Sequence, residues 1–267
     1  MQGMNKNNLD ILEKTIIECG EYATRMQSHV HRSHKKDGSI LTEVDLEISR
    51  RILTKINELF PDCAVISEEE TTEEKYNAPF TFVLDPIDGT DVYSLGLPSF
   101  AIALAILDKD KNPVGAMIDA PRFGIAKPSL FVRLDPNGQL IVDGSEFVPE
   151  EKSNDKEQIT MGSKSHKVFD FSLFHGKIRT FGSSVIHLLL PSLIKQFKGA
   201  VIEPCFVWDI AASHAIAKKC GLDIKYINGD DFEYTNDFIW KKKPFKMPIY
   251  AGSDEYIKEL SEELKPL

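Results

Sequence analysis

Apolar side chains recur every three or four positions over the first sixty residues, which is the spacing of an amphipathic helix. The first set is Leu9, Leu12, Ile16, Ala23 and Met26, and the second is Val44, Ile48, Ile52, Ile56 and Leu59. Pro61 closely follows the second set, and proline ends a helix because it lacks the amide donor. The pattern therefore predicts two helices that precede the strands.

After residue 62 the pattern changes to short continuous apolar runs, which are typical of buried strands. Runs at 63–66, 80–84, 99–107, 113–118 and 130–142 predict strands, and the last four are expected to form a sheet. A charged stretch at 146–158 is expected to cross the surface. Beyond it we expect strands near 159–161, 178–181 and 223–227, and helices near 184–197, near 209–219 and after Ser253. This organisation suggests two lobes, 1–150 and 151–267, without an internal repeat.

Composition and charge argue against nucleic acid and membrane as binding partners. The chain has 267 residues, 42% of them hydrophobic, which is enough for a large core, and a net charge of −9. Nucleic-acid binding needs a basic face, so we expect no nucleic-acid partner, and the one concentrated basic run, Lys241 to Lys243 with Lys246, is interpreted as a solvated edge. The longest apolar stretch, 100–107, is far shorter than the about 20 residues that cross a membrane, so no membrane partner is expected.

The cysteines and the beginning of the chain bear on its location. The four cysteines, at positions 19, 63, 205 and 220, show no spacing typical of a metal site. The polar residues 1–10 do not have the character of a signal peptide. We therefore expect a reduced, cytoplasmic environment.

The first candidate metal-binding segment is the hexapeptide Asp-Pro-Ile-Asp-Gly-Thr at 85–90, which directly follows the 80–84 run. Pro86 stiffens this turn and Gly89 permits backbone angles that other residues resist, so Asp85 and Asp88 are expected to be held at a short, fixed separation. Mg²⁺ prefers carboxylate, water and phosphate oxygens, and the chain offers no matching set of His and Cys ligands for zinc. Alone, the hexapeptide is equally well a tight turn whose carboxylates bind nearby amides.

Two more acidic segments are candidates for the same site. Glu68 follows the 63–66 run, and Asp209, after Trp208, opens a helix-like stretch. Taken singly, the glutamates at 68–70 are more often a solvated turn and Asp209 is more often a helix cap.

Five motifs in order resemble those of the inositol monophosphatase-like family of Mg²⁺-dependent phosphomonoesterases. They are the segment 36–45, the Glu68-Glu69 pair, the hexapeptide 85–90, Gly182-Ser183-Ser184, and Trp208-Asp209 with Ala211-Ala212. The resemblance implies a layered α/β/α/β/α sandwich, an α/β fold. It also implies two or three Mg²⁺ ions, a small phosphorylated metabolite as substrate, and a homodimer, which is common in the family.

The same resemblance implies a role for each matching residue. The first metal would be held by Glu68, Asp85 and the backbone carbonyl of Ile87, and the second by Asp85, Asp88 and Asp209. Asp45 and Thr90 would polarise the water that attacks phosphorus in line. The substrate would be bound by Gly89, Thr90, Gly182, Ser184 and Glu203, with Lys36 assisting phosphate binding.

Substrate identity is left open by the sequence. Residues 163–166 and 182–184 resemble those of bisphosphate nucleotidases, but Asp91 and Val185 stand where a lysine would help bind a second phosphate. Residues 96–100 resemble histidinol-phosphate phosphatases, and Glu203 resembles the glutamate with which inositol phosphatases accept sugar hydroxyls. We rank an inositol-1-phosphate-like substrate first.

Two further hypotheses belong to other classes. A protein of this fold can be a non-catalytic regulatory or ligand-binding module, because fold does not fix function. His29, His31 and His34 could form a zinc site, but their polar surroundings favour an exposed loop.

Overall fold

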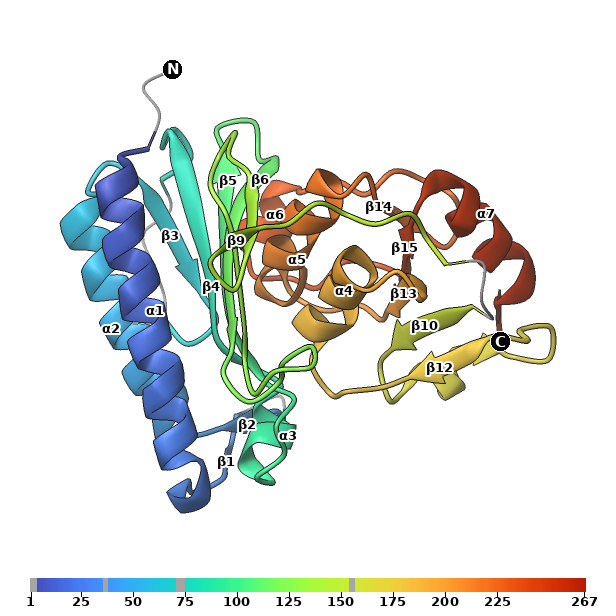
Figure 1. Cartoon of the computed structure of the whole chain (residues 1–267), viewed down its shortest axis with the longest axis horizontal. Coiled ribbons are helices and arrows are strands. Elements are labelled where there is room, and N and C mark those ends of the chain that lie inside the picture. Colours follow the sequence, from blue (N-terminus) through green and yellow to red (C-terminus); the bar gives the residue numbers. More distant parts are fainter. Residues whose placement is uncertain (1–3, 36–37, 71–74, 154–156) are drawn as a thin grey trace.

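A computed structural model describes residues 4–35, 38–70, 75–153 and 157–267 of the chain (Figure 1). The two helices predicted near the beginning are confirmed as α1 (Lys6–Met26) and α2 (Glu43–Leu59), which pack together on one face of a sheet. The side chain of Asn5 accepts a hydrogen bond from the amide of Asn7 and so caps α1. Thr42 caps α2 in the same way.

The adjacent sheet has seven strands, in the order in which they follow along the chain. They are β3 (Ala64–Ser67), β4 (Phe80–Asp88), β5 (Ala101–Asp108), β6 (Pro113–Ala120), β7 (Leu130–Leu134), β8 (Leu140–Val142) and β9 (Ser145–Glu146). β3 and β4 are parallel, and the later neighbours are antiparallel. The run at 130–142 was predicted as one segment, but it forms two strands joined by a turn.

Both faces of this sheet are buried, which explains why its strands are continuous apolar runs. Phe82 and Leu84 point into the core beneath α1 and α2, whereas Val83 points into a second core on the opposite face. β5 alternates likewise between Ile102 on the first side and Ala103 on the other.

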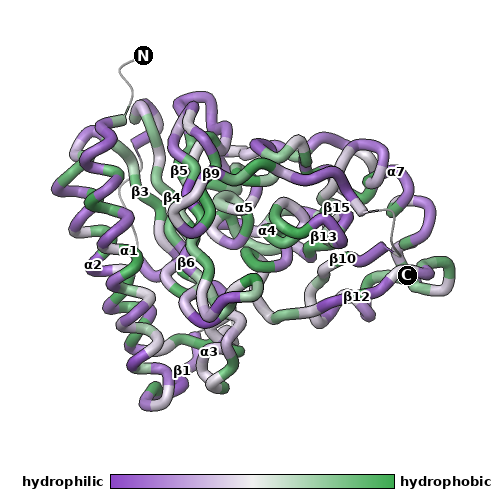
Figure 2. Tube along the Cα trace, viewed as in Figure 1, coloured by the Kyte–Doolittle hydropathy of each residue, from purple (hydrophilic) through white to green (hydrophobic). Residues whose placement is uncertain are grey.

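The second core is built around α4 (Ser184–Leu193) and α5 (Val207–Lys219), which lie between the seven-stranded sheet and a five-stranded one (Figure 1). Figure 2 shows that α4 is hydrophobic along most of its length, as expected for a helix covered on both sides. The order of the second sheet is β12 (Lys177–Arg179), β10 (Gln158–Met161), β13 (Phe197–Ile202), β15 (Ile249–Gly252) and β14 (Asp223–Tyr226). α7 (Asp254–Glu263) covers its outer face, which confirms the α/β/α/β/α layering.

Several short elements complete the described chain. They are α3 (Thr90–Ser94), α6 (Asn236–Ile239), the 3-10 helices η1 (Gln27–His29) and η2 (Ser165–Lys167), the antiparallel pair β1 (Ser33–His34) and β2 (Ile40–Leu41), and the antiparallel pair β11 (Phe169–Asp170) and β16 (Lys265–Pro266). The helix predicted at 184–197 ends earlier, at Leu193, and its last predicted position begins β13. Within the charged stretch at 146–158, residues 147–153 form neither helix nor strand and are mostly exposed. Among the described residues, no helix is long and apolar enough to cross a membrane.

Candidate active site

Parallel pairing of β3 and β4 brings the first two acidic segments together. Ser67 pairs with Leu84, and the amide of Glu68 donates to the carbonyl of Leu84 at 3.2 Å. Because both strands run the same way, they end at the same edge of the sheet. Glu68 therefore leaves β3 beside Asp85, as the sequence suggested.

A β-bulge then turns both aspartates of the hexapeptide to one face. The pairing of β4 with β5 shifts between Asp85 and Asp88, so one extra residue is accommodated there. Three residues apart in a regular strand, these two side chains would point to opposite faces. With the bulge, Ile87 enters the core beneath α1 and α2, while both carboxylates face α4 and α5.

Asp209 completes this group from the other side. One carboxylate oxygen from each of Asp85, Asp88 and Asp209 lies within 4.8 Å of the others. The Asp209 carboxylate also accepts a hydrogen bond of 2.6 Å from the amide of Phe206, so it caps α5 as well as facing the other two acids. Asp209 is the third residue of α5, and its bond to the amide of the residue that precedes the helix fixes its orientation.

Asp88 is held by the beginning of α4. Its Oδ2 accepts hydrogen bonds from the hydroxyl of Ser183 and, at 2.9 Å, from the amide of Val185. Ser183 also caps α4 by accepting from the amide of Ile186. We did not assign Ser183 a role from the sequence, although it lies in the Gly182-Ser183-Ser184 motif.

Burial and mutual repulsion disfavour the charged form of these carboxylates. Burial, followed by the charges of Glu68, Asp88 and Asp209, raises the pKa of Asp85 well above its usual value. Burial raises the pKa of Asp88 to about 7, although the hydrogen bonds from the beginning of α4 act to lower it. Burial and the charges of Asp88 and Glu68 raise the pKa of Asp209 well above its usual value.

A divalent cation fits this donor set. Asp85 Oδ1 is buried and receives no hydrogen bond from the part of the chain that the structure describes. A buried, unpaired carboxylate oxygen is costly unless a cation or donor meets it. The ligand types are all oxygen, which is the preference of Mg²⁺.

Glu68 lies at the margin of the group rather than inside it. Its Oε1 and that of Glu69 each accept a 2.6 Å bond from the Lys35 ammonium. Burial alone would lower the pKa of Lys35, but the two glutamates raise it above its usual value. Lys35 was not predicted as a site residue. Lys36, which was expected to assist phosphate binding, lies outside the described residues.

Asp45 and Thr90 are adjacent. Thr90 Oγ1 lies 3.2 Å from Asp45 Oδ1 and 2.8 Å from the carbonyl oxygen of Ile87, so its one hydrogen can reach either acceptor. Asp45 Oδ2 accepts from both the amide and the hydroxyl of Thr42 at the beginning of α2. Burial raises the pKa of Asp45 to about 6 despite these bonds.

Two glycines shape the backbone beside Asp88. Gly89 has a φ of +86° and a Cβ there would lie 3.1 Å from the carbonyl oxygen of Gly182. Gly182 has a φ of +83°, and its Cβ would lie 2.4 Å from a methyl group of Val92. Residues with a side chain rarely adopt such a φ. Both positions therefore favour glycine for two independent reasons, the positive φ and the lack of room for a Cβ. Ser184 is the first residue of α4 and is half-buried.

Glu203 follows β13 in the second sheet. Its Oε1 accepts a hydrogen bond from the hydroxyl of Ser165, and a Cβ on Gly162 would lie 2.2 Å from its Oε2. These contacts join Glu203 to the 162–165 segment. It is not a member of the group formed by Asp85, Asp88 and Asp209.

The structure agrees with the predicted exposure of the three histidines but not with the prediction for one residue of the lysine run. His29, His31 and His34 are exposed, as expected, but His29 ends a short 3-10 helix and His34 lies in β1, so that only His31 lies in a loop. The three histidines form no candidate metal group among the described residues. The interpretation of the lysine run as a solvated edge is wrong for Lys242. Its ammonium donates to two main-chain carbonyls beside Glu68, because the chain turns it inward, while its two neighbours remain exposed.

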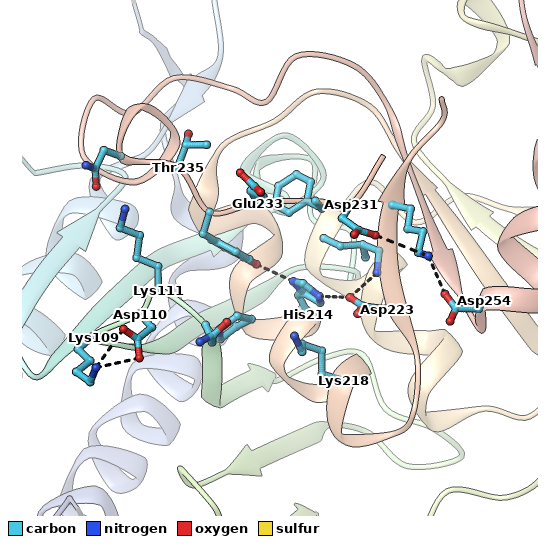
Figure 3. Close-up of a pocket in the computed structure, with 17 residues that line it drawn as sticks. Lys109, Asp110, Lys111, His214, Lys218, Asp223, Asp231, Glu233, Thr235 and Asp254 are labelled. Atoms are coloured by element: carbon cyan, nitrogen blue, oxygen red, sulfur yellow. Dashed lines mark hydrogen bonds and ion pairs between the residues drawn. The ribbon is translucent and has the colours of Figure 1, made fainter. Parts of the chain in front are cut away.

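A cavity of about 900 Å³ lies elsewhere, between the β5–β6 hairpin and the segment 223–236 (Figure 3). At its wall His214 is paired with Asp223 at 2.8 Å and with the hydroxyl of Tyr234 at 3.0 Å. None of the predicted site residues lines it. The candidate site is therefore located by its group of carboxylates and not by this cavity, which lies on a different surface of the protein.

Comparison with known proteins agrees with this geometry. Residues 9–257 match the model of the inositol monophosphatase family. The chain belongs to this family. The family resemblance noted in the sequence is confirmed, and a phosphatase-type protein is supported in general.

Curated relatives in the family carry different names. The chain is 24% identical over 265 residues to a fructose-1,6-bisphosphatase/inositol-1-monophosphatase of Thermotoga maritima, covering 95% of this chain and 98% of the relative. It is 35% identical over 125 residues to the 3'(2'),5'-bisphosphate nucleotidase CysQ of Haemophilus influenzae, covering 45% and 46%. It is 24% identical to the Nus factor SuhB of Pasteurella multocida, covering 87% and 85%.

Solved structures show the same fold. An inositol monophosphatase from Thermotoga maritima matches with a TM-score of 0.75 and 23% identity, over 96% of this chain and 97% of that one. An IMPase/NADP phosphatase complexed with Mg²⁺ and phosphate matches with a TM-score of 0.73 and 17% identity, over 91% and 90%.

Proposed function

We propose that the chain is a Mg²⁺-dependent phosphomonoesterase that hydrolyses a small phosphorylated metabolite. The observation that carries this proposal is the group formed by the buried Asp85 and Asp88 and the half-buried Asp209, in which one Asp85 oxygen is left without a donor among the described residues. Membership of the family supports it, as does the related fold of a phosphatase complexed with Mg²⁺ and phosphate.

Two ions, or three, would be held by this group together with Glu68 and the carbonyl of Ile87. Glu68, Asp85 and the carbonyl of Ile87 would hold one, and Asp85, Asp88 and Asp209 another, with Asp85 shared. When bound, Mg²⁺ supplies positive charge beside the phosphoryl oxygens and lowers the pKa of a coordinated water. The elevated pKa values of the aspartates fit this assignment, because a cation offsets the repulsion that raises them.

Asp45 and Thr90 would handle the proton of the attacking water. Asp45 Oδ2 is engaged by Thr42, so Oδ1 is the atom left to receive the Thr90 hydroxyl, 3.2 Å away. A hydroxyl that donates to Asp45 presents its lone pairs to water and accepts a hydrogen from it. With a pKa of about 6, Asp45 is ionised at neutral pH and can act as the base in this relay.

Substrate contacts would come from two sides of the acidic group. The amides of Gly89 and Thr90 would donate to the phosphate oxygens. Gly182, Ser184 and Glu203 would contact the remainder of the substrate, and Glu203 would accept hydroxyl groups. An inositol-1-phosphate-like monoester remains our first choice.

Bisphosphate nucleotidase is the second candidate within the class, favoured by the 35% identity to a CysQ nucleotidase over 125 residues. Histidinol phosphate remains an alternative substrate from the sequence motifs. A non-catalytic role remains the alternative of another class, because relatives named Nus factor SuhB match over most of the chain.

We also propose a division into lobes near residue 150, with a homodimer in the cytoplasm. The division is supported by strand order, since the seven-stranded sheet uses residues 64–146 and the five-stranded sheet uses residues 158–252. The homodimer is supported by the family resemblance. The location is supported by the four cysteines, which are unpaired.

The test is phosphate release, with and without Mg²⁺, from inositol-1-phosphate, adenosine 3′,5′-bisphosphate, histidinol phosphate and fructose 1,6-bisphosphate. Asp237→Asn, a surface substitution outside the site, serves as the control for Asp85→Asn. We expect Mg²⁺-dependent release with a preference that identifies the substrate class. Absence of release from all four by folded, Mg²⁺-binding protein would overturn the proposal for these substrates and favour the binding-module alternative.

A further inference from the structure

Lys242 occupies an unusual position for the middle residue of a lysine run. Its ammonium donates two hydrogen bonds of 2.6 Å, to the carbonyl oxygens of Ser67 and Glu70. These carbonyls bracket Glu68, which lies more than 170 positions earlier in the chain. Lys241 and Lys243, by contrast, are exposed and form ion pairs with Asp237.

A second contact joins Lys242 to the other acidic segment. Its Nζ lies 5.6 Å from the centre of the Trp208 ring, a distance at which an ammonium and an aromatic face attract each other. Trp208 is buried, stacks on Phe206 with ring centres 4.9 Å apart, and directly precedes Asp209. One ammonium therefore touches both the turn that carries Glu68 and the beginning of the helix that carries Asp209.

The backbone at Lys242 indicates that these contacts determine the local conformation. Its φ is +47°, in the left-handed region that residues with a side chain rarely adopt. Such a conformation persists where surrounding contacts hold it in place. The half-buried ammonium, satisfied by two carbonyls of a distant segment, supplies such contacts.

The charge of Lys242 has the sign that the neighbouring acids need. Glu68, Glu69 and Glu70 are close enough to act on its ammonium, as is Lys35. Lys35 approaches Glu68 at its carboxylate, whereas Lys242 binds the main chain on either side. Lys242 thus leaves the Glu68 oxygens available while it fixes their backbone.

We propose that Lys242 is a positioning residue for the metal centre: it fixes the Glu68 turn against Trp208-Asp209, so that Glu68 and Asp209, which lie far apart in the chain, are held at one metal centre. This inference rests on the proposed function only in that the acids bind a divalent metal. It does not depend on the substrate or on turnover.

The test compares Lys242→Met with Lys243→Met in the full-length protein. Methionine keeps the apolar length of lysine and removes the ammonium, and Lys243 is a matched exposed lysine beside it. The readout is Mn²⁺ binding measured by the electron paramagnetic resonance of free Mn²⁺, without substrate. Melting temperature in a chelator is measured in parallel.

We expect Lys242→Met to bind Mn²⁺ about tenfold more weakly, the usual cost of removing a residue that orients a metal ligand, while Lys243→Met equals the wild type. Unchanged Mn²⁺ affinity in Lys242→Met would overturn the inference. An equal loss of affinity in Lys243→Met would also overturn it, since net charge alone would then explain the effect.

Two further results separate this inference from the proposed function. Wild-type protein that binds no Mn²⁺ overturns the metal centre and the role of Lys242 together. Wild-type protein that binds Mn²⁺ without phosphatase activity contradicts the proposed function, and the comparison of the two variants still decides the role of Lys242. If Lys242→Met does not fold, Lys242→Gln replaces it, with the same expected loss and the same refuting result.

Discussion

Asp88→Asn should make the metal-free protein more stable and at the same time impair metal binding and phosphatase activity. Asp88 is buried, faces Asp85 and Asp209, and accepts bonds from Ser183 and the amide of Val185. Asparagine has nearly the same shape, and its amide oxygen can keep both of these bonds. The substitution therefore removes a buried negative charge with little change in packing.

The magnitude follows from the pKa of Asp88, which burial raises from 3.8 to about 7. A folded-state pKa above the unfolded value means that the native protein binds the extra proton, so stability is lost as the pH rises from about 4 to about 7. At 1.36 kcal/mol per pKa unit, full ionisation at pH 8 costs about 4 kcal/mol. Because the pKa values of Asp85 and Asp209 are also raised, these two acids stay protonated when Asp88 ionises, which limits the repulsion, and we expect a gain of about 2 kcal/mol.

The assay is thermal unfolding of chelator-treated wild-type and Asp88→Asn protein at pH 5 and pH 8. A gain of about 2 kcal/mol corresponds to about 5 °C in a protein of this size, and it should be much smaller at pH 5. Mg²⁺ at 100 times its Kd should raise the stability of the wild type by about 2.7 kcal/mol, and that of the variant far less. We also expect Asp88→Asn to lose most of the activity.

Two results would refute this reasoning. A variant less stable than the metal-free wild type at pH 8 would show that Asp88 does not contribute a costly buried charge. An unaltered rate of phosphate release would contradict the assignment of Asp88 to a metal site.

Three other predictions concern single residues. Thr90→Val should fold normally and lower kcat by about 100-fold, because the hydroxyl between the attacking water and Asp45 is lost; steady-state kinetics with Mg²⁺ would test this, and a near-normal kcat would exclude the relay. Asp119→Asn should stabilise the Mg²⁺-loaded protein by about 4 kcal/mol at pH 8 and by less than half of that at pH 5, because burial raises the pKa of Asp119 from 3.8 to about 7 and the cost of ionising it accumulates between these two pH values. Chemical unfolding of Asp119→Asn and the wild type at both pH values measures this gain in stability, and a gain that is the same at pH 5 and pH 8 would contradict the prediction. Gly182→Ala should destabilise the fold by about 2 kcal/mol, through its positive φ and the contact with Val92, and equal unfolding midpoints for variant and wild type would contradict that account.

Much of the first half of the fold was predictable from the sequence, because its signals are local. The apolar spacing of α1 and α2 and the continuous run of β4 reflect which faces are buried. The hexapeptide also indicated a strand that ends in acids. The bulge between Asp85 and Asp88, which turns both to one face, depends on pairing with β5 and was not predicted.

β13 and β15 were not predicted, and each carries a glycine that leaves room for the ring of Tyr256 on α7. A Cβ on Gly199 would lie 2.9 Å from the ring of Tyr256, and one on Gly252 would lie 3.2 Å from it. Glycine weakens the strand signal in the sequence, yet here it makes room for the helix that covers the sheet.

The site shows the same division between local and long-range causes. Motif order was enough to select Asp85, Asp88 and Asp209, which the structure brings within 4.8 Å. It gave no role to Ser183, whose hydroxyl binds Asp88, because that contact depends on how α4 is capped. Lys242 was misinterpreted for a similar reason, since its partners lie in a segment far away in the chain.

The proposed metal centre of a phosphatase is formed by Asp85, Asp88 and Asp209. Its most direct test is the rate of phosphate release as Mg²⁺ is added back to chelator-treated protein, using the best substrate of the four and comparing the wild type with Asp85→Asn. We expect no release from the wild type without Mg²⁺, a saturable rise as Mg²⁺ is added, and almost no release from Asp85→Asn at any Mg²⁺ concentration. Release that is independent of Mg²⁺, or equal in the wild type and Asp85→Asn, would contradict this proposal.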